Sequence, residues 1–105
     1  MPYEIEFADA AIKHLRSLTA RERATIVGAI EEQLSYEPLV ETRNRKPLRP
    51  NPIAAWELRV GSLRAFYDKT SPEPSSAQPS GIVRVLAIGK KVRNVLRIGG
   101  AEIDL

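Results

Sequence analysis

The sequence predicts a single α+β domain in which a helical hairpin covers one face of an antiparallel four-stranded sheet. Two observations predict this fold class. Hydrophobic residues recur at helical spacing between residues 9 and 37, and apolar and polar residues alternate in short segments on either side of that region. The order of these elements is β-α-α-β-β-β, and a chain of 105 residues has room for one such domain.

The N-terminal part of the chain predicts one strand and two helices. Apolar and acidic residues alternate over residues 3–7, which is the period of a strand with one buried face. Apolar residues then recur at helical spacing over residues 9–18. Thr19 and Glu22 fit a capping box, which predicts that a second helix begins there and stops before Pro38. The short connection between the two helices predicts a hairpin that packs on the sheet.

Three further strands are predicted after an irregular stretch. Four prolines preclude regular structure over most of residues 38–52. Alternation predicts strands at residues 56–60 and 63–68, joined by a two-residue Gly-Ser turn. Residues 82–88 form the most apolar segment and are expected at the centre of the sheet. The first strand is expected to join the same sheet after the helical excursion.

Two segments in the C-terminal part are expected to differ from these strands. Residues 71–81 are a low-complexity stretch of Ser, Pro, Gln and Gly, for which we expect a mobile loop. Gly89 is predicted to end the last strand. Residues 90–98 are predicted to form a short basic C-terminal helix, with Gly99 as its stop.

The composition limits the kinds of site and compartment that we expect. The chain has no cysteine, so disulfides and thiolate metal sites are excluded, and its one histidine, His14, is expected at the surface. We therefore expect no metal and no cofactor. No apolar run approaches the ~20 residues needed to cross a bilayer, and the first residues lack the pattern of a signal peptide. These features favour a cytoplasmic protein without membrane contact.

Charge is divided unevenly along the chain. Residues 1–42 carry four Lys/Arg and eight Asp/Glu, whereas residues 43–105 carry twelve Lys/Arg and five Asp/Glu. A basic half of this kind attracts a polyanion and raises its association rate. The alternative is a basic surface that only keeps the protein in solution.

Six short stretches of the chain match a known family in their order and spacing. They are Tyr3-Glu4-Ile5-Glu6-Phe7, Ala11-Ile12-Lys13-His14-Leu15, Lys46-Pro47-Leu48, Trp56-Glu57-Leu58-Arg59-Val60-Gly61, Arg64-Ala65-Phe66-Tyr67-Asp68 and Val85-Leu86-Ala87-Ile88-Gly89-Lys90-Lys91. In these stretches the chain resembles the RelE/ParE superfamily of type II toxin–antitoxin systems. The resemblance implies a RelE/ParE-like toxin that binds a cognate antitoxin. Many members cut messenger RNA on the ribosome and so inhibit translation, and others inhibit DNA gyrase.

Cleavage of RNA without a metal needs a base that takes the proton of the 2′-OH, a cation that stabilises the phosphorane and an acid that protonates the 5′ oxygen. Three residues are candidates for these roles. By resemblance, Arg64 matches the arginine that contacts the scissile phosphate, and Lys91 lies where an active-site arginine occurs. Glu57 is a candidate general base, as a glutamate is in another branch of the family. The alternatives are structural: Arg64 pairs with Glu57 or Asp68, and Glu57 pairs with Arg59.

Six other basic residues are candidates for RNA binding. Lys90, Lys91 and Arg93 follow the last predicted strand. The alternative role for these three residues is a solvated basic turn, or a helix end that is capped by cations. The candidates are Arg45, Lys46, Arg59, Lys90, Arg93 and Arg97.

The C-terminal end departs from RNA-cutting members, which often place a tyrosine or histidine there. Arg97 occupies the corresponding place, and residues 99–105 contain neither Tyr nor His. An arginine is a poor acid or base because it does not deprotonate in proteins. Tyr67 is an alternative acid but is expected in the core, as is Trp56, for which stacking on RNA is the alternative. Three functions stay open: a ribosome-dependent mRNA endoribonuclease, a gyrase inhibitor, and a weakly active member that mainly binds its antitoxin.

Overall fold

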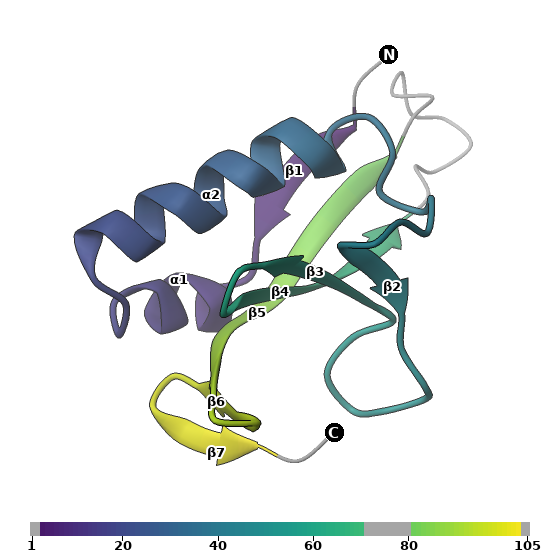
Figure 1. The fold of residues 1–105 in the computed structure, drawn as a ribbon. Helices are drawn as coiled ribbons and strands as arrows, with labels where there is room; N and C mark the ends of the chain where they lie inside the picture. Colours follow the sequence, from purple (N-terminus) through teal and green to yellow (C-terminus); the bar gives the residue numbers. More distant parts are fainter. Residues whose placement is uncertain (1–2, 71–80, 104–105) are drawn as a thin grey trace.

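The computed structural model describes residues 3–70 and 81–103, and within them the chain folds as an α+β domain (Figure 1). Two helices, α1 (Asp9–Leu15) and α2 (Ala20–Leu34), follow the first strand, as the sequence predicts. The strands are β1 (Glu4–Phe7), β2 (Arg45–Pro47), β3 (Trp56–Val60), β4 (Leu63–Thr70), β5 (Ile82–Val92), β6 (Val95–Ile98) and β7 (Ala101–Ile103). Of the predicted mobile loop, residues 71–80 lie outside the described part of the chain, and Gly81 is buried immediately before β5.

Strand β5 is the centre of the sheet, as its apolar sequence predicts. Along one edge it pairs with β4 in antiparallel orientation. Along the other edge it pairs with two strands: β1 runs parallel to residues 82–85, and β6 runs antiparallel to residues 89–92. The sheet order is β2-β3-β4-β5-β6-β7, with β1 beside β5. The predicted antiparallel meander is therefore present, and β1 is its parallel exception.

The helices cover one face of this sheet. The predicted capping box starts α2: the Thr19 hydroxyl accepts from the Glu22 N–H at 3.1 Å, and the Glu22 carboxylate accepts from the Thr19 N–H at 3.0 Å. Ile26, Ile30 and Leu34 follow at four-residue intervals on one stripe and are completely buried. They pack against side chains of β3, β4 and β5 in the main hydrophobic cluster. Burying one such side chain contributes roughly 1.5–3 kcal/mol, so this stripe fixes the hairpin on the sheet.

The opposite face, which we call the helix-free face, carries Glu57, Arg64, Phe66 and Ala87. Cross-strand pairing places Phe66 beside both Glu57 and Ala87. This face is only partly open, because the loop after β2 and the β6–β7 hairpin extend on the side away from α2 (Figure 1). Their apolar side chains form a second cluster with the sheet. Its members are Ala54, Phe66, Ala87 and Ile98, with Leu48, Ile53, Leu86, Leu96 and Ile103 packed around them.

The predicted C-terminal helix over residues 90–98 is wrong. Strand β5 continues through Gly89 to Val92, and a tight turn at Arg93 and Asn94 leads into β6. Both turn residues have positive φ, 53° and 66°, which is the geometry of a two-residue hairpin turn. Gly89 is needed for a different reason: a Cβ there would lie 2.8 Å from the backbone oxygen of Arg97. The glycine marks a close approach of two strands and not a strand end.

Two other boundaries differ from the prediction. The first helix ends at Leu15 and not at residue 18. The stretch predicted to be irregular contains the short strand β2, which lies at the edge of the sheet. Its last residue, Pro47, is compatible with this position because an edge strand has backbone N–H groups that need no partner in the sheet. With β2, β6 and β7, the sheet has more strands than the four that we predicted.

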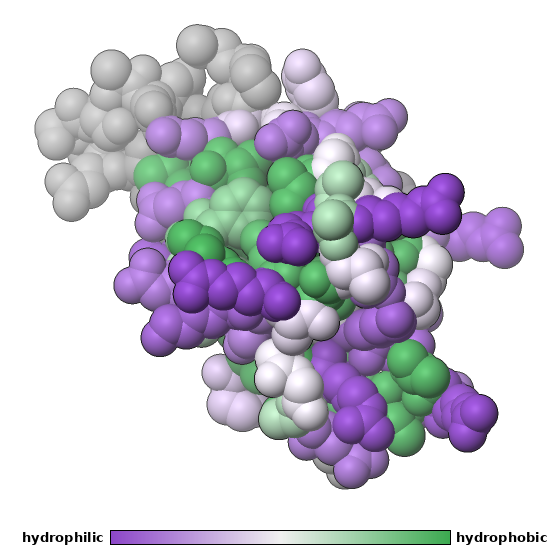
Figure 2. Space-filling view, turned by 90° about the vertical axis from the view of Figure 1, so that its left-hand side faces the viewer, coloured by the Kyte–Doolittle hydropathy of each residue, from purple (hydrophilic) through white to green (hydrophobic). Residues whose placement is uncertain are grey.

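Hydrophobic side chains also reach the surface. In the space-filling view, hydrophobic patches lie between extended hydrophilic side chains (Figure 2). Large exposed hydrophobic residues include Ile12 on α1, Tyr36 and Val40 after α2, and Val92 at the end of β5. Tyr36, Leu39 and Val40 lie within five residues of each other, whereas Ile12 and Val92 are exposed singly, which is usual on a folded domain and does not by itself indicate a binding site.

Candidate functional site

A depression on the helix-free face brings together four of the predicted site residues: Glu57, Arg59, Arg64 and Lys91. It has a volume of about 260 Å³ and lies where β3, β4 and β5 meet the C-terminal hairpin. The other residues that line it are Leu48, Asn94, Leu96 and Ile103.

Strand register explains why these four residues meet. Glu57 and Arg59 alternate on β3, so both side chains point to the helix-free face. Arg64 lies directly opposite Arg59 in the β3–β4 pair and opposite Gly89 in the β4–β5 pair. Lys91, two residues further along β5, then lies on the same face.

Glu57 holds the cations of the depression together. Its carboxylate oxygen Oε1 lies 2.5 Å from Nε of Arg59 and 3.9 Å from Nε of Arg64. The Glu57 side chain is 9% exposed and the Arg64 side chain 12%, whereas the Arg59 side chain is 40% exposed. A buried charge needs such partners because desolvation would otherwise make it costly. The ion pair that the sequence offered as an alternative role for Glu57 is therefore present.

Arg64 is fixed by the backbone as well as by Glu57. Its Nη1 donates to the carbonyl oxygens of Gly61 at 2.7 Å and Leu63 at 2.9 Å, both at the β3–β4 turn. Burial lowers the pKa of Arg64, and the Glu57 carboxylate opposes this shift. The guanidinium stays charged, since arginine does not deprotonate in proteins. The site therefore presents a cation whose orientation is set before any ligand arrives.

The remaining predicted RNA-binding residues lie outside the depression. Lys46 is exposed on β2 and lies opposite Glu57 in the strand pair, so its side chain is on the helix-free face at the edge of the site. Arg93 is exposed at the β5–β6 turn. Lys90 and Arg97 alternate to the other side of the sheet, where Lys90 pairs with Glu22 of α2. Lys90 and Arg97 therefore do not share a surface with Arg64.

The predicted RNA-binding role of Arg45 is corrected here, because the position of this residue does not support contact with RNA. It is buried and binds the end of α2: its Nη1 donates to the carbonyl oxygens of Gln33 at 3.2 Å and Glu37 at 2.6 Å. Its Nη2 lies 3.5 Å from the Glu37 carboxylate. A cation is favourable there because the last carbonyls of a helix lack partners within the helix. Arg45 thus ties β2 to α2.

The structure also places the aromatic and histidine candidates. Tyr67 is buried on the helix side, as expected; its hydroxyl donates to the carbonyl oxygen of Pro38 at 2.6 Å, and burial raises its pKa. Trp56 packs against the core, with its ring 6.3 Å from that of Tyr67. His14 is only partly exposed, and its Nδ1 accepts from the Ile88 N–H at 3.2 Å. None of these three side chains lines the depression.

The sequence pattern does not indicate Asn94, Leu96 and Ile103 as site residues, because it predicts a helix over residues 90–98 and no element at residue 103. The pair Arg93-Asn94 was the available signal, since asparagine tolerates the left-handed conformation of a tight turn. Within the described residues, no group of three metal-ligating side chains comes together, and no helix is long and apolar enough to span a membrane.

Comparison with known proteins identifies the fold. No protein-family model and no curated protein matches the chain. A solved structure does: one chain in the crystal structure of the toxin–antitoxin complex RelBE2 from Mycobacterium tuberculosis superposes with a TM-score of 0.69. The two chains are 27% identical, over 87% of this chain and 93% of that chain. The fold of this chain is RelE-like. The resemblance that the six sequence stretches indicate is confirmed.

Proposed function

We propose that this chain is the toxin of a toxin–antitoxin pair and that it cleaves RNA without a metal. The observation that carries the proposal is the fixed guanidinium of Arg64, which lies in a depression beside Glu57, Arg59 and Lys91. A planar guanidinium matches the oxygens of a phosphodiester, with which it makes two parallel hydrogen bonds. The RelE-like fold supports the proposal, since the neighbouring structure is a toxin–antitoxin complex.

In the proposed reaction the RNA supplies its own nucleophile. The 2′ oxygen attacks the adjacent phosphorus, its proton passes to Glu57, and the bond from phosphorus to the 5′ oxygen breaks. Lys91 gives a proton to that leaving oxygen, so the products are a 2′,3′-cyclic phosphate and a 5′-hydroxyl. Arg64 and Arg59 bind the phosphoryl oxygens as negative charge develops on them. Glu57 and Lys91 take the proton-transfer roles because the arginines that line the depression do not titrate.

The Glu57–Arg59 ion pair makes this reaction dependent on substrate. In the free protein the Glu57 carboxylate is occupied by Arg59, with Arg64 close by. An incoming phosphate competes for both guanidinium groups, and the Arg59 side chain is exposed enough to move toward it. Its departure leaves the Glu57 carboxylate oxygen Oε1 open to accept from the 2′-OH. The free protein is therefore expected to be a poor ribonuclease until its substrate is positioned, as on a ribosome with bound mRNA.

A second candidate function is a toxin that acts by binding, for instance to DNA gyrase, with little or no cleavage. The observation that favours it is chemical: after Tyr67 the chain contains neither tyrosine nor histidine, and the depression offers only Lys91 as an acid. Mapping of RNA ends after induced expression, together with an assay of DNA supercoiling, separates the two functions. New RNA ends that disappear in Arg64→Ala but persist in Arg16→Ala, a matched change at an exposed arginine after α1, would support the nuclease.

We also propose that the antitoxin binds the basic half of the chain, residues 43–105. This half has seven more basic than acidic residues, whereas the first 42 residues have four more acidic than basic ones. An acidic or amphipathic segment that folds as it docks would complement the basic half. A complex in which the antitoxin contacts only residues 1–42 would contradict this proposal.

A further inference from the structure

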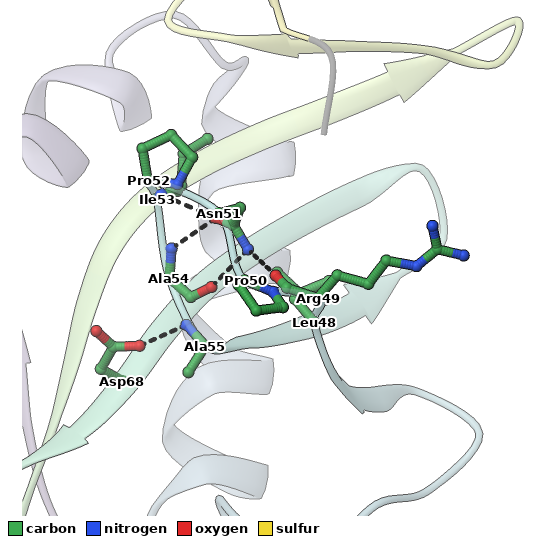
Figure 3. A pocket seen from close by; sticks show the side chains of 9 residues that line it. All are labelled: Leu48, Arg49, Pro50, Asn51, Pro52, Ile53, Ala54, Ala55 and Asp68. Atoms are coloured by element: carbon green, nitrogen blue, oxygen red, sulfur yellow. Dashed lines mark hydrogen bonds between the residues drawn. The ribbon is translucent and has the colours of Figure 1, made fainter.

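The loop of residues 48–55, which follows β2 on the helix-free face, has a fixed shape. The Asn51 side chain organises it: Nδ2 donates to the carbonyl oxygens of Arg49 at 2.7 Å and Ala54 at 2.9 Å (Figure 3). Its Oδ1 accepts from the N–H groups of Ile53 at 2.8 Å and Ala54 at 3.1 Å. The Ala55 N–H donates to Oδ1 of Asp68 on β4 at 2.5 Å, which anchors the loop to the sheet.

This loop lines a second cavity, open to the surface and of about 440 Å³, beside the depression that contains Arg64. Its walls are mainly apolar, with Pro50, Pro52 and Ile53 among them, and Asp68 closes one side. Leu48 lines both the cavity and the depression, so the two hollows adjoin each other. A flat apolar group that entered the cavity would therefore be held next to the proposed phosphate site.

The spacing of the two hollows follows from β4. Arg64, Phe66 and Asp68 alternate on the helix-free face, and the register irregularity between β4 and β5 does not alter this alternation. At about 3.3 Å per residue, Arg64 and Asp68 lie roughly 13 Å apart along the strand. Phe66, covered by the loop, separates them. Arg64 and Asp68 are therefore too far apart to bind the same phosphate group, but a single strand of RNA that contacts both would span a few nucleotides.

Asp68 gives the cavity a chemical preference. One of its carboxylate oxygens accepts from Ala55, and no donor from the described residues reaches the other. A free carboxylate oxygen accepts from the amino group of adenine or cytosine. Uracil has no amino group. Its N3–H lies between two carbonyl oxygens, and the carboxylate repels these oxygens. Exposed prolines and the half-buried Ile53 supply apolar contact for the flat face of the base.

We propose that residues 48–55 and Asp68 form a base-binding subsite for RNA that selects a base with an amino group over uracil. The inference rests on the proposed function, because it takes RNA as the occupant of the neighbouring depression. Arg49 fits an RNA occupant: its exposed side chain points away from the loop interior, where it can reach a phosphate of the same strand (Figure 3).

Binding of labelled hexaribonucleotides to the full chain tests the subsite without requiring cleavage. We expect fluorescence anisotropy to show that A6 and C6 bind about tenfold more tightly than U6 at one fixed salt concentration. In Asp68→Asn the side-chain oxygen still accepts from Ala55, so the amide group faces the cavity as a donor. This variant should therefore prefer U6. Arg64→Ala should weaken all three complexes equally and leave their ratio unchanged.

A second variant covers the case in which Asp68→Asn does not fold. Ala55 is exposed and lines the cavity, so Ala55→Phe fills the cavity while its backbone N–H still binds Asp68. It should remove the preference among the three hexamers. The proposal is overturned if the ratio is the same in the folded variants and the wild type. It is also overturned if Asp68→Asn weakens only antitoxin binding, since the cavity would then belong to the protein partner.

The failure of the subsite and the failure of the proposed function are distinguishable. If induced expression yields no RNA cuts but the hexamers keep their ratio and Asp68→Asn inverts it, cleavage fails and the subsite stands. If RNA is cut and the bases around the cuts are the same in wild type and Asp68→Asn, the subsite fails and cleavage stands.

Discussion

The two faces of the sheet are built from the same strands but are stabilised by different interactions. On the helix side, Ile26, Ile30 and Leu34 bury apolar surface against Leu58 and Val85. On the helix-free face, charged side chains lie among apolar ones, and Glu57 is buried only because two arginines neutralise it. The comparison shows that alternation along a strand places residues for the core and residues for the candidate site next to each other in the sequence. Ala65 lies in the core on the helix side, and its neighbour Arg64 lies on the helix-free face.

The largest effect on stability is expected from the helix side. Ile30→Ala removes three carbons from a fully buried position and should lower the free energy of unfolding by about 2–5 kcal/mol. Ile12→Ala is the matched control, because Ile12 is 44% exposed and its loss should cost less than about 0.5 kcal/mol. Urea unfolding measures both changes. Equal losses in the two variants would mean that the helices do not pack as described.

The largest effect on activity is expected from the helix-free face. Arg64→Ala removes a preorganised cation and should lower the rate of RNA cleavage by about 10²–10³-fold. Arg64→Lys should recover only part of the rate, since an ammonium keeps the charge but not the paired hydrogen bonds. Mapped RNA cuts and growth arrest report activity, and urea unfolding reports stability. If Arg64→Ala unfolds as readily as Ile30→Ala, the arginine is a structural partner of Glu57 and the proposed role is wrong.

A smaller effect should separate two ion pairs that differ in burial. In a double-mutant cycle, Glu57→Gln and Arg59→Gln should show a coupling energy of about 1 kcal/mol in urea unfolding. The same cycle with Glu6→Gln and Arg84→Gln should show less than that, because these side chains are 50% and 49% exposed. Equal coupling in the two cycles would indicate that Glu57 is not held as tightly as its contacts imply.

The smallest effect is expected at His14 and depends on pH. Burial lowers the pKa of His14, so the folded state binds its proton less readily than the unfolded state, whose pKa is about 6.5. Stability should therefore be complete above about pH 6.5 and decrease as the pH falls toward the lower folded pKa. His14→Asn keeps an acceptor for the Ile88 N–H but does not titrate, and it should abolish this dependence in thermal unfolding. A dependence that survives in His14→Asn would assign it to another group.

The parts of the fold that depend on local chemistry could be predicted from the sequence. Thr19 and Glu22 satisfy each other three residues apart, and Gly61 supplies the positive φ of a two-residue turn. Both signals act within a few residues and survive any tertiary context. The clustering of Glu57, Arg59 and Arg64 was also predictable, because it follows from strand alternation and one hairpin.

The parts that depend on distant contacts could not be predicted. Gly89 looks like a strand end in the sequence, and only the approach of the Arg97 backbone shows why a side chain is excluded there. Arg45 looks like a surface cation, and its burial depends on where α2 ends. His14 has no distinctive neighbours in the sequence, yet it accepts from Ile88, which lies 74 residues away. In each case the decisive partner lies far along the chain.

The position of β5 has a consequence for the order in which the chain is made. This strand is the shared partner of β1, β4 and β6, and it begins only at Ile82. Until it has left the ribosome, β1 has no strand to pair with, the helices lack the β5 side chains that they cover, and Lys91 is not yet present. A nascent chain therefore acquires its core and its proposed active site in the same late step of synthesis. An incomplete chain is expected to be both unfolded and harmless.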